Sequence, residues 1–109
     1  MRAPLALLML AVLAIAAAPA EAAAIPHADV QILARQFLPP VTAVSSGGTI
    51  TFHNIEPVDH HQPQALDGSW LVHLGNGQSG DVTITAPSGS QVPYRCGIHV
   101  YMTGVIVVV

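Results

Sequence analysis

The sequence has no lysine and only one cysteine, Cys96. Arginine occurs at positions 2, 35 and 95 alone, and charged residues make up 8% of the chain. Because these residues cannot form a basic patch, we expect neither nucleic acid nor an anionic lipid surface as a partner. A single cysteine also excludes a disulfide bond within the chain. If the protein is exported, its thiol must therefore be buried or bound to be protected from oxidation.

The first 24 residues have the pattern of a secretory signal peptide. Met1 and Arg2 give a positively charged start, and residues 5–18 are an unbroken apolar run. Small residues follow Pro19, so that cleavage after Ala22 or Ala24 fits equally well. The apolar run is shorter than the roughly 20 residues that span a bilayer, which disfavours the alternative of an uncleaved anchor. We therefore expect a periplasmic or secreted domain over residues 25–109, with no stable membrane insertion after cleavage.

Short runs of strand-forming residues, separated by Gly, Pro, Ser and Asn, follow the signal region. Thr49–His53 and residues 82–86 alternate apolar and polar side chains, as half-buried strands do. Further strands are expected at residues 30–33, 41–44, 70–74, 92–96 and 104–109, and loops at residues 54–63 and 75–80. Since no window shows a strong helical period, the pattern predicts an all-β domain, either an antiparallel β-sandwich or a barrel.

The loop before the last strand contains a thiol, an imidazole and a thioether at regular spacing. Cys96, His99 and Met102 follow a C-x-x-H-x-x-M pattern. Sulfur and nitrogen donors suit copper, whereas calcium and magnesium require oxygen ligands. A structural zinc site normally has several thiolates, and only one is available here. One loop cannot enclose a metal alone, and His60 and His61, in the predicted 54–63 loop, are candidates for the second imidazole.

The segment Tyr94-x-Cys96-x-x-His99-x-x-Met102-x-Gly104-x-Ile106-x-Val108 resembles the C-terminal end of the cupredoxins, the type 1 blue copper proteins. The resemblance is to their plastocyanin and amicyanin branch, with loop spacings nearest to amicyanin. Upstream, Gly48-x-Ile50-x-Phe52-x-Asn54, followed six residues later by His60, is similar to the strand and loop that deliver the family's first histidine. Phe37-x-Pro39 before Val41 and Val44 is similar to the family's second strand.

The resemblance implies a Greek-key β-sandwich that binds one copper ion and cycles between Cu(I) and Cu(II). It implies His60, Cys96 and His99 as equatorial ligands and Met102 as a long axial ligand. The position after the first histidine is often Asn, Thr or Ser in this family, and here it is His61, which is the alternative ligand. The implied function is one-electron transfer by a monomer, without enzymatic activity, to redox partner proteins that dock transiently near His99.

Two other functions compete with the electron carrier. A copper-binding and delivery protein would use a looser site richer in Met or His, and no such cluster stands out. A Cys–His hydrolase would need an orienting carboxylate and a substrate cleft, which this short domain does not suggest. The remaining histidines have simpler interpretations, with His27 solvated near the start of the domain and His53 and His73 structural.

Overall fold

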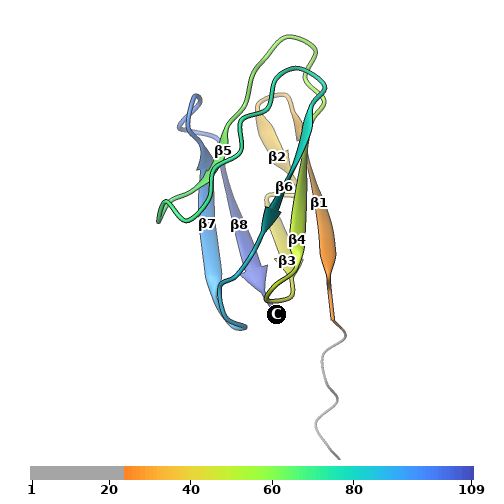
Figure 1. Cartoon of the computed structure of the whole chain (residues 1–109). Helices are drawn as coiled ribbons and strands as arrows, with labels where there is room; N and C mark the ends of the chain where they lie inside the picture. Colours follow the sequence, from red (N-terminus) through yellow and green to blue (C-terminus); the bar gives the residue numbers. More distant parts are fainter. Residues whose placement is uncertain (1–23) are drawn as a thin grey trace, which may run out of the picture.

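The computed structural model describes residues 24–109, which form eight strands and no helix. The eight strands pack as two four-stranded sheets, face to face (Figure 1). One sheet has the order β2-β1-β4-β6, with bounds Gln36–Leu38, His27–Leu33, Thr49–Asn54 and Ser79–Thr83. The other has the order β3-β8-β7-β5, with bounds Val41–Val44, Thr103–Val108, Gln91–Cys96 and Pro63–Ala65. The predicted all-β sandwich is therefore confirmed, and the expected signal peptide lies outside the described residues except for Ala24.

The sheets are mixed, which differs from the purely antiparallel arrangement expected. β1 pairs with β4 in parallel, and β3 pairs with β8 in parallel, while the other neighbours are antiparallel. Both parallel pairs join strands that are not consecutive in sequence, so each needs a connection that crosses from one sheet to the other. Alternation of apolar and polar residues cannot show whether two strands pair in parallel or antiparallel. It specifies which face of a strand is buried, and not which strand lies alongside.

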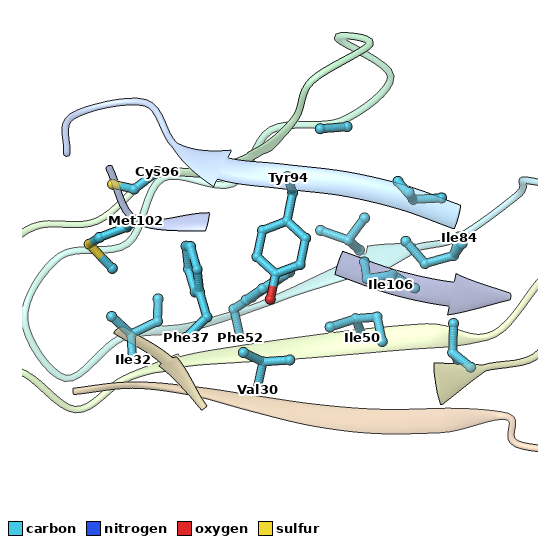
Figure 2. Packing of buried hydrophobic residues seen from close by; sticks show 14 of the residues in the cluster. Val30, Ile32, Phe37, Ile50, Phe52, Ile84, Tyr94, Cys96, Met102 and Ile106 are labelled. Carbon is cyan, nitrogen blue, oxygen red and sulfur yellow. The ribbon is translucent and has the colours of Figure 1, made fainter. Parts of the chain in front are cut away.

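Alternation of buried and exposed residues directs one face of each sheet into the core. In β4 the buried positions are Ile50, Phe52 and Asn54, and in β7 they are Val92, Tyr94 and Cys96. Aromatic rings fill the centre, with Tyr94 in edge contact with Phe37 and Phe52 at centroid distances of 4.8 and 5.4 Å (Figure 2). This core holds the two sheets together and fixes the ends of β7 and β8.

Two short strands were not expected, and one expected strand does not form. β2 and β5 have three residues each, too few for a sequence pattern to reveal. Residues 70–74 form no strand, only isolated bridges at Leu71 and Leu74. β6 begins at Ser79, inside the segment expected to be a turn. None of the described residues belongs to a helix long and apolar enough to cross a membrane.

Candidate metal centre

The loop between β7 and β8 lies at the end of the sandwich opposite the C-terminus (Figure 1). The backbone N–H of Cys96 donates to the carbonyl of Met102 at 3.0 Å, and the N–H of Met102 donates to the carbonyl of His99 at 2.9 Å. These bonds close the loop tightly. As a result the sulfur atoms of Cys96 and Met102, both buried, lie at the same end of the core (Figure 2).

The loop after β4 brings a second histidine to the same end of the core. His61 forms a two-way backbone bridge with Leu74, with N···O distances of 2.9 and 2.8 Å. Residues paired in this way project their side chains to the same face of the ladder. Leu74 is a core residue, so His61 also points inward, and its side chain is fully buried.

The predicted ligand His60 is not part of this cluster. It is exposed, and its ring lies 5.9 Å from the ring of His73, which is also exposed. Its neighbour His61 occupies the inward position, because adjacent side chains on an extended segment point to opposite sides. The structure therefore brings to the cluster His61, the residue that the sequence left as the alternative, and not His60.

Three donor atoms converge at this end of the sandwich. The Sγ atom of Cys96 lies 3.9 Å from Nδ1 of His61 and 3.8 Å from Nδ1 of His99. Metal–sulfur and metal–nitrogen bonds of about 2.3 and 2.0 Å, spread by about 120°, place sulfur and nitrogen about 3.7 Å apart. The observed separations therefore match a trigonal site for one ion. The same three residues form a group whose ligand atoms all lie within 4.8 Å of one another.

Two backbone N–H groups point at the sulfur atom of Cys96. The N–H of Gln62 lies 3.3 Å from Sγ, and that of His99 lies 3.5 Å from it. Such donors stabilise negative charge on a thiolate and fix its direction. Because Gln62 follows His61, the segment that supplies one imidazole also supplies a hydrogen bond to the sulfur.

The environment of His61 favours its neutral form, which is the form that can bind a metal. Burial lowers the pKa of His61, and repulsion by a protonated His99 lowers it further. The other ring nitrogen, Nε2, faces Oε1 of the buried Glu56 at 3.9 Å and has no hydrogen-bond partner. The carboxylate of Glu56 is held by the backbone N–H of Arg35 at 2.7 Å.

The donor chemistry of this cluster fits copper. A thiolate, two imidazoles and a thioether form the soft and borderline set that copper prefers. Two carboxylates, those of Glu56 and Asp59, form a second group with His61. The sequence pattern had identified Cys96, His99 and Met102 and had left His60 and His61 as candidates for the second imidazole, of which the structure brings His61 to the cluster.

Comparison with known proteins places this arrangement in context. Neither a protein-family model nor a curated protein sequence matches the chain. Among solved structures, a copper-containing nitrite reductase from Thermus scotoductus SA-01 is similar at 29% identity, with a TM-score of 0.66. That match covers 74% of this chain but only 22% of the reductase, so the chain spans about a fifth of that enzyme.

Structures of amicyanin are similar over most of their length. A reduced amicyanin variant matches with 22% identity and a TM-score of 0.65, covering 77% of this chain and 83% of amicyanin. A reduced Cu(I) form of another variant matches with 23% identity and a TM-score of 0.64, covering 81% and 84%. The chain has the cupredoxin fold. The donor set at the end of this cupredoxin-like sandwich, His61, Cys96, His99 and Met102, is that of a type 1 site for one copper ion.

Proposed function

We propose that this cupredoxin-like chain is an exported blue copper protein that carries one electron at a time. His61, Cys96 and His99 would be the equatorial ligands and Met102 the axial ligand. The observation that carries the proposal is that an imidazole nitrogen of His61 and one of His99 both lie within 3.9 Å of the sulfur of Cys96. When bound, copper would supply a one-electron couple between Cu(I) and Cu(II).

The protein would keep the donor geometry nearly constant during transfer. Mixed nitrogen and sulfur donors suit both oxidation states of copper, so little rearrangement is needed. The loops that carry the donors are tied together, because the N–H of Gly97 donates to the carbonyl of Gln62 at 2.9 Å. The side-chain amide of Asn54 donates to the carbonyls of Asp59 and Gly75 at 2.8 and 3.0 Å. This bracing favours electron transfer over reversible release of the ion.

The surface around His99 would be the docking face for a redox partner. His99 is partly exposed, whereas His61 is fully buried. Ile98, Val100 and Tyr101 beside it are 50, 59 and 64% exposed, and apolar surface of this extent suits brief contact with a partner protein. The proposed carrier acts as a monomer and has no catalytic residue.

The proposal includes export and processing. Residues 1–24 would be a signal peptide removed after Ala22 or Ala24, and the domain from residue 25 would act in the periplasm or outside the cell. N-terminal sequencing of the exported protein tests this part. We expect a chain that begins at residue 23 or 25, and a chain that still begins at Met1 would overturn it.

Voltammetry of the copper-loaded protein, combined with a Cu(I) chelator, separates the carrier from a delivery protein. We expect a reversible one-electron wave and retention of the copper through repeated cycles with the chelator present. The Cys96→Ser variant, whose hydroxyl is a poor donor to copper, should show no such wave. Loss of the ion on each reduction would instead support copper delivery, the alternative function.

A further inference from the structure

The turn between β1 and β2 has a backbone conformation that its residues do not favour. Leu33 pairs with Gln36, so Ala34 and Arg35 alone form the turn of this hairpin. Their φ angles are +51° and +54°, in the left-handed region. A two-residue turn of this kind favours glycine at its second position, because a Cβ atom is strained there. The arginine found at that position instead indicates that its side chain has a role outside the turn.

Arg35 connects the hairpin to the segment that carries His61. Its backbone N–H donates to Oε1 of Glu56 at 2.7 Å, and its Nε donates to Oδ2 of Asp59 at 3.0 Å. The side chain of Asp59 is 27% exposed, so water only partly screens this ion pair. Because Asp59 stands two residues before His61, the approach to that ligand is tied to the hairpin.

The same guanidinium reaches the loop that carries the other ligands. Nη1 of Arg35 donates to the hydroxyl of Tyr101 at 3.1 Å, across 66 positions of sequence. Tyr101 lies between His99 and Met102, and the centroid of its ring is 6.1 Å from that of His99. A guanidinium suits such a bridge, because its donors are fixed in one plane and can hold two partners at a set angle.

The bridge is particular to this arginine. Within residues 24–109 the only other basic side chain is Arg95, which is exposed on β7. Arg95 forms no ion pair within that part of the chain. Arg35 therefore has a position and a set of partners that its charge alone does not explain.

We propose that Arg35 is a positioning residue for the copper centre, which holds the two ligand-bearing segments at a fixed separation through Asp59 and Tyr101. It acts through these two residues and is not itself a ligand. The inference rests on the proposed function, since it assigns Arg35 a part in keeping copper bound through the redox cycle. Without the bridge, the two segments separate more easily and the ion leaves sooner.

The variant Arg35→Gly separates this role from a role in folding. Glycine is the residue that the turn favours, and the variant keeps the backbone N–H that bonds Glu56. The free energy of unfolding of the metal-free variant, measured with urea, should therefore equal or exceed that of the parent protein. A Cu(I) chelator should remove copper from the reduced variant at least about threefold faster, less than the loss of about 10–100-fold in affinity typical of groups that contact a ligand directly. Copper removal at the parent's rate would overturn the proposal.

Two further variants break the bridge without removing a charge. Tyr101→Phe removes one hydroxyl from a ring that is 64% exposed, so folding should be unaffected. Arg35→Lys keeps the positive charge, but an ammonium group lacks the planar fork that holds two partners. Both variants should release copper faster than the parent protein. Release at the parent's rate from both would overturn the proposal.

The matched control is Arg95→Gln, which removes one positive charge and breaks no bridge between the ligand-bearing segments. It should release copper at the parent's rate. If Arg35→Lys matched the parent while Arg95→Gln released copper as fast as Arg35→Gly, charge and not position would explain the effect, and the proposal would be wrong.

Visible absorption of the copper-loaded parent separates this inference from the proposed function. A parent protein without the blue copper–thiolate absorption would overturn the proposed function itself. A blue parent whose variants at Arg35 and Tyr101 all lose copper at the parent's rate would overturn only the role of Arg35.

Discussion

Nδ1 of His61 lies 3.9 Å from Sγ of Cys96, although 35 positions separate the two residues in the sequence. Backbone hydrogen bonds bring them together, because the segment of Gln62 pairs with Gly97 on one side and His61 pairs with Leu74 on the other. The position of the imidazole is therefore set by strand pairing within the fold. Variants at Met102, Glu56 and His61 test what this arrangement implies, and a variant at Gly104 tests the core beneath it.

Replacement of the buried Met102 by glutamine should lower the reduction potential. An amide oxygen is a harder donor than a thioether and stabilises the oxidised ion relative to the reduced one. A tenfold change in that preference corresponds to about 59 mV for one electron, and we expect a fall of at least this size. Voltammetry measures it, and the visible spectrum should remain that of a copper–thiolate site. An unchanged potential and spectrum would show that Met102 does not bind the copper.

Replacement of Glu56 by glutamine should raise the reduction potential. The carboxylate of Glu56 lies 3.9 Å from Nε2 of His61 and favours the more positively charged oxidised site. Glutamine keeps an oxygen to accept the N–H of Arg35 but removes the charge. We expect a rise of tens of millivolts. The control is Asp67→Asn, which removes the same charge from an exposed turn, and an equal rise in that variant would contradict a local effect.

Gly104→Ala should destabilise the protein by about 1–3 kcal/mol through overpacking. Gly104 is the register partner of Tyr94, and a Cβ atom at this position would collide with the tyrosine ring. The ring is fully buried among Phe37 and Phe52, so it cannot move away without disturbing them. Urea unfolding measures the loss. Thr103→Ala, at the exposed neighbouring position, should change the free energy of unfolding by less than about 0.5 kcal/mol.

The parts of the fold and site that local patterns determine were predictable. The alternation in Thr49–His53 identified β4, and the short spacing of Cys96, His99 and Met102 identified a loop that acts as a unit. In both cases the residues that decide the structure are close in the sequence. The resemblance to cupredoxins predicted how these strands are arranged as a β-sandwich, and the structure has that fold.

The choice between His60 and His61 could not be made from local sequence. Either residue can point inward on an extended segment, and the bridge to Leu74 decides which one does. A count of residues from Asn54 selected His60, whereas the structure buries the next residue, His61. The useful signal was Leu74 itself, an apolar residue beside the polar His73, but its pairing with His61 is a long-range contact. The parallel pairs and the three-residue strands β2 and β5 also depend on such contacts.

The most direct test of the copper centre compares His61→Gly with His60→Gly by visible absorption after copper loading. The first variant removes a buried donor 3.9 Å from the sulfur of Cys96, and the second removes an exposed ring near His73. We expect His61→Gly to lose most of the blue copper–thiolate absorption and to recover it partly when free imidazole is added. His60→Gly should stay fully blue. The reverse pattern, or full colour in both variants, would contradict the assignment of His61 to the copper.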